Sequence, residues 1–170
     1  MKKDENIIVF NEKIAEEILC DLFSEELFNY FGFNLMTCIT LSLLEDKCAF
    51  IGAGCSRRAY ELNNHVIKIE VDTFKEQTRT EIAVYENYKN ISAEIYAADI
   101  ESNIVFQEKL NTNFTLEDIL LFTDSDIEDL DDLDGYDLED YFGANIYDIH
   151  QYNIGFNSVG ELKVLDLGII

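Results

Sequence analysis

The chain has 170 residues, of which 48% are hydrophobic, and is therefore long enough to bury the core of one domain. Its 35 acidic and 12 basic residues give a net charge of -23, which argues against direct binding to nucleic acid or to an anionic membrane surface, because both need Lys and Arg. None of the four cysteines belongs to a C-x-x-C pair, so we expect buried thiols in a reducing cytoplasm rather than a zinc site.

The first part of the chain is predicted to be helical. Between residues 7 and 45, apolar residues recur at spacings of three to four, with Glu and Asp between them. We interpret residues 1–47 as an N-terminal helical extension and find no chemistry in it. No apolar stretch of the sequence is long enough to predict a membrane span or a signal peptide.

Short apolar and alternating runs follow, separated by Gly-rich and Asn-Asn turns, and these runs predict strands. The predicted strands are 48–52, 59–62, 65–71, 95–99 and 103–110. A helix is predicted over 74–90, where the spacing places Ile82, Tyr85 and Tyr88 on one side.

Residues 111–162 form a distinct stretch, because they contain no Lys or Arg. Twelve acidic residues lie within 117–140, and Thr115 followed by Asp118 predicts the start of a helix. An apolar face is expected from Leu130, Leu133 and Leu138. A solvated acidic helix face or loop explains this stretch, and a surface that meets a basic protein partner is the alternative.

Two glycines stand at the turn that follows the first predicted strand. Gly52 and Gly54 form a G-x-G pattern, which lets the backbone of a hairpin approach phosphate oxygens because no Cβ is in the way. The pattern is not a Walker loop, which needs Gly-Lys-Ser/Thr. It is not a dinucleotide fingerprint either, because a strand follows it rather than a helix.

Lys68 lies between β-branched residues in the third predicted strand, so its side chain is expected to point to one face of a sheet. A buried ammonium group needs an anionic partner. Phosphate oxygens or a Glu on the following helix would supply one, and we favour Glu81 over Glu76 and Glu86. The alternative is a Lys whose stem packs while its ammonium group reaches water.

The end of the chain carries a third group of polar residues. Asp148 precedes a predicted strand over 153–156, Asn153 begins that strand, and Asp166 follows a second predicted strand over 162–165. Phosphoryl transfer needs a carboxylate near the incoming hydroxyl group and oxygen ligands that hold magnesium on the phosphates. An Asp, an Asn and a second Asp supply that set.

Together these motifs resemble protein kinases, in which a Gly-rich loop, a strand Lys, a helix Glu, a D-x-x-x-x-N segment and D-F-G follow in this order. The chain is most similar to small kinase-like proteins of bacteriophages and bacteria, over roughly 48–168. The shared motifs are G-x-G-x-S-R from Gly52, V-I-K ending at Lys68, D-x-H-x-x-N from Asp148, and D-L-G from Asp166.

The resemblance implies an α+β, protein-kinase-like fold. We expect N-terminal helices over 1–47, then a five-stranded antiparallel N-lobe sheet with one helix over 48–110. A reduced acidic C-lobe is expected over 111–170. The setting it implies is the cytoplasm of a bacterium, including the bacterial host of a phage.

The resemblance also implies ATP and Mg²⁺ as ligands. Gly52 and Gly54 would cover the phosphates, and Lys68, held by Glu81, would contact the α- and β-phosphates. Backbone groups near Glu108 and Leu110 would meet the adenine.

The same resemblance assigns the catalytic and metal-binding roles. Asp148 would be the catalytic carboxylate, while Asn153 and Asp166 would bind magnesium. His150 has two interpretations, one in which it positions the catalytic loop and one in which it is an ordinary packed histidine.

The sequence also departs from the family. Arg57 replaces the third glycine of the loop, and Ile146-Tyr147 stands where kinases have His-Arg or His-Gly. The sequence ends two residues after Gly168, so no activation segment is expected. Two functions follow: a minimal ATP- and Mg-dependent phosphotransferase, or an inactive kinase-like protein that binds and modulates a host protein through the acidic segment 117–140. A nucleotide sensor that binds ATP and changes partners is a third hypothesis that combines the two.

Overall fold

The computed structural model describes residues 6–23, 39–54, 56–71, 77–123, 126–143 and 149–166. The protein is α+β, and its helices and strands fall into two compact units. The first unit comprises Met1–Arg79 and Glu94–Lys109, and the second comprises Thr80–Ala93 and Leu110–Ile170. Among the described residues, no helix is long and apolar enough to cross a membrane.

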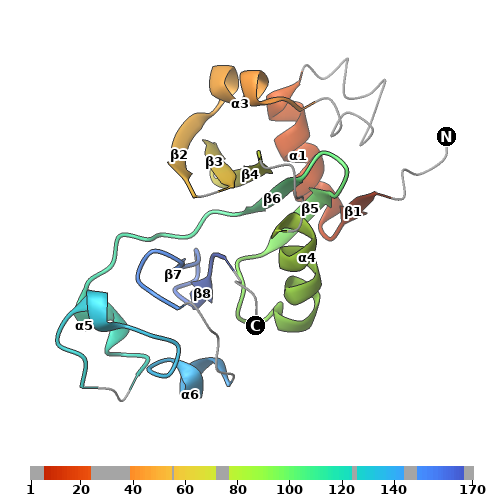
Figure 1. Ribbon diagram of the computed structural model, residues 1–170. Helices are drawn as coiled ribbons and strands as arrows, with labels where there is room; N and C mark the ends of the chain where they lie inside the picture. The colour runs from red at the N-terminus through yellow and green to blue at the C-terminus, as the bar shows by residue number, and fades with distance from the viewer. Residues whose placement is uncertain are drawn as a thin grey trace. The chain divides into compact units, whose positions relative to one another are not determined.

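The first unit is built on a six-stranded sheet with the order β1-β5-β6-β4-β3-β2 (Figure 1), in which every neighbouring pair is antiparallel. Its strands are β1 (Ile7–Val9), β2 (Ala49–Ala53), β3 (Arg57–Leu62), β4 (His65–Glu70), β5 (Ile95–Asp99) and β6 (Ile104–Glu108). The five predicted strands of this region are confirmed as β2 to β6.

The prediction of a helix from residue 7 and the prediction of a five-stranded sheet are both wrong. Residues Ile7–Val9 form the edge strand β1, in which Ile7 pairs with Asp99 and Val9 with Ala97 of β5. Three successive β-branched residues fit a pleated surface better than a helix. The run is too short to show a period, and its pairing partner lies far away in the sequence.

The helical structure predicted for the N-terminal region is confirmed in two of its segments, Glu12–Leu22 and Leu41–Lys47. α1 (Glu12–Leu22) begins after Asn11, whose side chain accepts a hydrogen bond from the backbone N–H of Ile14 (3.4 Å). α3 (Leu41–Lys47) begins after Thr40 in the same way. Both caps satisfy an N–H group that the helix itself leaves without an acceptor. Predicted helical residues within 24–38 lie outside the described part of the chain.

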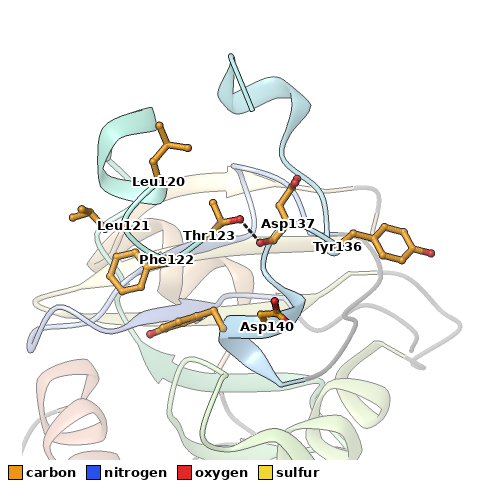
Figure 2. A pocket seen from close by; sticks show the side chains of 8 residues that line it. Leu120, Leu121, Phe122, Thr123, Tyr136, Asp137 and Asp140 are labelled. Atoms are coloured by element: carbon orange, nitrogen blue, oxygen red, sulfur yellow. Dashed lines mark hydrogen bonds between the residues drawn. The ribbon is translucent and has the colours of Figure 1, made fainter. Parts of the chain in front are cut away.

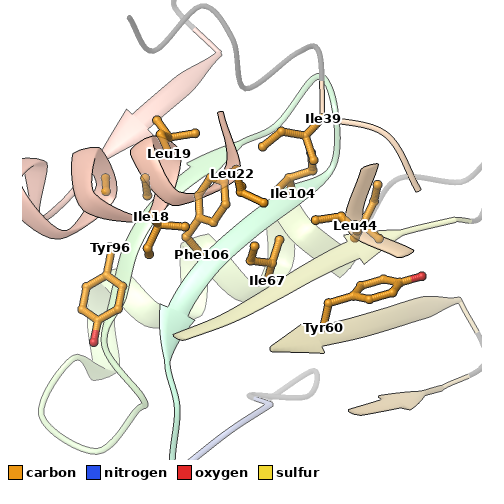
Figure 3. Close-up of a cluster of buried hydrophobic side chains, with 13 residues drawn as sticks. Ile18, Leu19, Leu22, Ile39, Leu44, Tyr60, Ile67, Tyr96, Ile104 and Phe106 are labelled. Atoms are coloured by element: carbon orange, nitrogen blue, oxygen red, sulfur yellow. The ribbon is translucent and has the colours of Figure 1, made fainter. Parts of the chain in front are cut away.

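One hydrophobic core joins these two helices to the sheet (Figure 3). Side chains from α1 and α3 meet side chains from the central strands β4 and β6, so the helices cover one face of the sheet. The largest fully buried members are Ile18, Leu19, Leu22, Leu44, Tyr60, Ile67, Ile104 and Phe106.

The helix α4 (Gln77–Tyr88) begins in the first unit and continues in the second. Ile82 and Tyr85 are buried and Tyr88 is partly buried, which confirms the predicted apolar side of this helix. The first predicted residues of the helix, up to 76, lie outside the described residues.

The second unit is organised around a hairpin of β7 (Ile154–Phe156) and β8 (Leu162–Val164). Backbone hydrogen bonds extend it on both sides, with Asn111 beside Phe156 and Ile91–Ala93 beside Val164. Its buried core includes residues from the acidic stretch as well as from the hairpin. The core residues are Ile91, Ile119, Leu133, Leu138, Phe142, Ile149, Ile154, Leu162 and Val164.

Before the hairpin, the described part of the acidic stretch contains three short helices: α5 (Leu116–Ile119), the 3-10 helix η2 (Leu130–Asp132) and α6 (Glu139–Phe142). The predicted helix start is confirmed, because Thr115 and Asp118 form a capping box. The predicted apolar face is also found, because Leu133 and Leu138 are buried in the core and Leu130 packs against it.

Candidate functional site

Lys68 belongs to a row of residues that pair across neighbouring strands of the first unit's sheet. Gly52 of β2 pairs with Ala59 of β3, Ala59 pairs with Lys68 of β4, and Lys68 pairs with Val105 of β6. Residues directly opposite in an antiparallel sheet point to the same face. The backbone register therefore brings Gly52 and Lys68 onto one face of the sheet, with Ala59 between them.

The Lys68 side chain points away from the hydrophobic core of the first unit. Its neighbours Ile67 and Ile69 belong to that core, and successive side chains of a strand alternate between faces. Lys68 is only 9% exposed, although its face of the sheet is not the one covered by α1 and α3.

The two loop glycines are not required by the fold of the described residues. Neither has a positive φ, whereas Gly143 and Gly160 do. A Cβ placed at Gly52 or at Gly54 would meet no described atom within 4 Å. Glycine at these positions thus leaves open space beside the backbone, which is the arrangement that a ligand needs in order to approach closely.

A buried carboxylate that the sequence analysis missed lies on the same strand as Lys68. Oε2 of Glu70 accepts hydrogen bonds from the backbone N–H (3.1 Å) and from the hydroxyl group (3.0 Å) of Thr78. Oε1 accepts a longer one from the N–H of Gln77 (3.4 Å). Glu70 therefore holds the start of α4, where N–H groups lack partners within the helix.

The predicted adenine-binding and Lys-pairing residues are divided between the units. Glu108 ends β6 in the first unit, and its backbone N–H donates to the carbonyl oxygen of Glu94 (2.8 Å). That N–H is thus already used in the sheet. Glu81 and Leu110 belong to the second unit, and both are buried.

Asn153 and Asp166 are brought to one end of the hairpin in the second unit. The backbone N–H of Leu165 donates to the carbonyl oxygen of Asn153 (2.7 Å), and Asp166 follows directly on the chain. Asn153 is buried and Asp166 is exposed. The side-chain oxygen of Asn153 accepts a hydrogen bond from the N–H of His150 (3.0 Å), which uses one of its two lone pairs.

His150 is packed within the turn that precedes β7. Its Nδ1 accepts a hydrogen bond from the backbone N–H of Tyr152 (3.2 Å), and the two rings lie 5.9 Å apart. Asp148, the predicted catalytic carboxylate, lies outside the described residues, as does Gly168. Within the described ranges, no three His, Cys, Asp or Glu side chains are grouped as a metal site.

No protein-family model matches the sequence, and no curated protein matches it. Among solved structures, the chain shows a distant similarity to the choline kinase LicA from Streptococcus pneumoniae, with a TM-score of 0.37 and 13% sequence identity. The alignment covers 84% of this chain and 69% of that one.

Proposed function

We propose that this protein binds ATP together with Mg²⁺ and has the residues of a minimal phosphotransferase. The observation that carries the proposal is the position of Lys68, which is buried on the sheet face opposite the hydrophobic core and lies in line with Gly52. A Lys in such a position presents a positive charge on the same face of the sheet as the glycine loop, where phosphate oxygens could bind it.

The glycine loop supports a phosphate as that anion. Gly52 and Gly54 have open space beside them among the described residues, and the fold does not itself demand glycine there. Phosphate oxygens that approach the backbone at the loop would meet the ammonium group of Lys68 from the same face of the sheet.

The hairpin end of the second unit supplies the oxygen ligands that magnesium prefers. The side chain of Asn153 carries an amide oxygen, and the carboxylate of Asp166 is exposed. Magnesium would neutralise charge on the phosphates during transfer. Asp148 would orient the hydroxyl group of the acceptor and receive its proton.

Calorimetric titration with ATP, with and without Mg²⁺, tests this proposal. We expect Mg-dependent binding that weakens at least about tenfold in Lys68→Met and in Asp166→Asn, since each loses a charge that faces the phosphates or the metal. Lys13→Met removes an exposed Lys of α1, the helix that covers the opposite face of the sheet, and is the control that keeps wild-type affinity. A folded wild-type protein that does not bind ATP would overturn the proposal.

An inactive, partner-binding protein is the second candidate function. It is favoured by the acidic stretch 111–162, whose sequence has no basic residue and whose described part carries an exposed groove. Transfer of labelled γ-phosphate to the protein itself or to water, compared between wild type and Asp148→Asn, separates the two. ATP binding without any transfer in the wild type would favour the second candidate.

A further inference from the structure

An open groove of about 510 Å³ lies within the second unit (Figure 2). One side is formed by the chain that follows α5, with Leu120, Leu121 and Phe122. The other side is formed by the turn before α6 and by α6 itself, with Tyr136, Asp137 and Asp140. None of the residues to which we assign nucleotide or metal binding lines this groove.

The walls of the groove present large apolar side chains to water. Leu121 is 81% exposed and Tyr136 is 69% exposed, and Leu120 and Tyr141 are exposed as well. Such residues are normally found singly on a protein surface, and a group of them around one hollow marks an interaction site.

The groove is also held in shape by hydrogen bonds. The hydroxyl group of Thr123 donates to the backbone carbonyl oxygen of Asp137, which joins the two sides (Figure 2). The carboxylate of Asp137 accepts a hydrogen bond from the N–H of Asp134 (2.9 Å), and that of Asp134 accepts one from the N–H of Tyr136 (2.7 Å). A preorganised groove loses less conformational entropy on binding.

Charge determines which partner fits. Asp137 and Asp140 line the groove, and the sequence has no Lys or Arg anywhere in 111–162 to pair with them. Carboxylates and an exposed tyrosine ring that line one groove favour a partner with several cations, because the ring face and the carboxylates each attract positive charge.

We propose that this groove binds a basic, partly apolar segment of another protein. An Arg or Lys side chain of that segment pairs with Asp140, a second basic side chain lies against the ring of Tyr136, and a neighbouring apolar side chain packs against Leu121. The net charge of -23 disfavours a second copy of this chain as the occupant, and also an anionic lipid surface. The groove does not depend on the proposed nucleotide site.

Fluorescence anisotropy with a short labelled peptide, in which arginines alternate with leucines, tests the proposal without any nucleotide present. We expect saturable binding that weakens about threefold to tenfold in Tyr136→Ala and in Asp140→Asn, and steeply with added salt. Leu121→Ser should weaken binding by a similar factor. A peptide with glutamates in place of the arginines should not bind.

Matched variants distinguish binding in the groove from a general effect of negative charge or of exposed apolar side chains. Glu139→Gln removes the same charge one residue before Asp140 but outside the groove, and Val159→Ser removes an equally exposed apolar side chain (76%) elsewhere in the unit. Both should bind the peptide as the wild type does. Equal losses of peptide affinity in Glu139→Gln and Asp140→Asn would mean that the attraction is non-specific, and would overturn the proposal. Light scattering that shows a dimer, which Leu121→Ser abolishes, would also overturn it.

Discussion

The carboxylate of Glu70 binds both the backbone N–H and the hydroxyl group of Thr78, and both residues are buried. Glu70 is the last residue of β4, two positions after Lys68, and Thr78 is the second residue of α4. The contact fixes the start of α4 against the strand that carries the proposed phosphate-binding Lys. The hydrogen-bonded pair Glu70–Thr78 thus positions β4 and α4 more specifically than a hydrophobic contact between them would.

Replacing Glu70 should destabilise the protein. In Glu70→Ala, the N–H and hydroxyl groups of Thr78 lose their acceptor in a buried place, so we expect a loss of about 2 kcal/mol in the free energy of unfolding, measured with urea. Thr78→Val alone should cost less, because the backbone N–H keeps its partner. The double variant tests the assignment, since additive losses would contradict a direct contact.

Gly155 is required by a close approach in the hairpin of the second unit. A Cβ at this position would lie 2.9 Å from the carbonyl oxygen of Asn111 and 2.9 Å from Cβ of Leu110. Because both neighbours are held by the backbone bonds between Asn111 and Phe156, Gly155→Ala should cost about 2 kcal/mol of stability, measured by chemical unfolding. A variant as stable as the wild type would show that this strand can shift.

Much of the sheet could be predicted from local patterns. The Asn63-Asn64 turn between two alternating runs predicts the hairpin of β3 and β4, and Asn63 does adopt a positive φ of 53°. The edge strand β1 could not be predicted in this way, because β5, the strand with which it pairs, lies about ninety residues later, and its three residues show no period. Tertiary pairing decided its conformation.

In the candidate site too, features of the local sequence could be predicted, whereas contacts between distant residues could not. Lys68 stands out in the sequence because a charged residue interrupts a β-branched run. The register that aligns it with Gly52 through Ala59 cannot be predicted from local patterns, because it depends on a bulge between Phe50 and Gly52. Glu70 was overlooked because a Glu at the end of a strand usually faces water, and only the arrival of Thr78 makes it a buried acceptor.

The loop glycines offer a contrast with Gly155. Since Gly52 and Gly54 have open space beside them, Gly52→Ala and Gly54→Ala should leave stability unchanged or raise it by up to about 1 kcal/mol. If phosphates approach the backbone there, the same variants should weaken ATP binding severalfold in calorimetry. Unchanged affinity in both variants, with binding retained in the wild type, would move the phosphate site away from this loop.

The capping box at the start of α5 should make stability depend on pH in the acidic range. The side chain of Asp118 accepts hydrogen bonds from the backbone N–H (2.7 Å) and the hydroxyl group (2.8 Å) of Thr115. These bonds lower the pKa of this carboxyl below its ordinary value, and the bond from the backbone N–H has the larger effect. A carboxyl whose pKa is lower in the folded state contributes stability above its unfolded-state pKa, and this contribution is lost as the pH falls through the folded-state pKa.

The test compares urea midpoints of wild type and Asp118→Asn from neutral pH downwards. The wild type should be the more stable protein at neutral pH, and the difference should shrink to nothing once the carboxyl is protonated in both states. Glu117→Gln, which removes the neighbouring exposed carboxylate, is the control for overall charge and should show no such convergence. A difference between wild type and Asp118→Asn that stays constant with pH would mean that the loss comes from altered packing of α5 rather than from the ionised carboxylate.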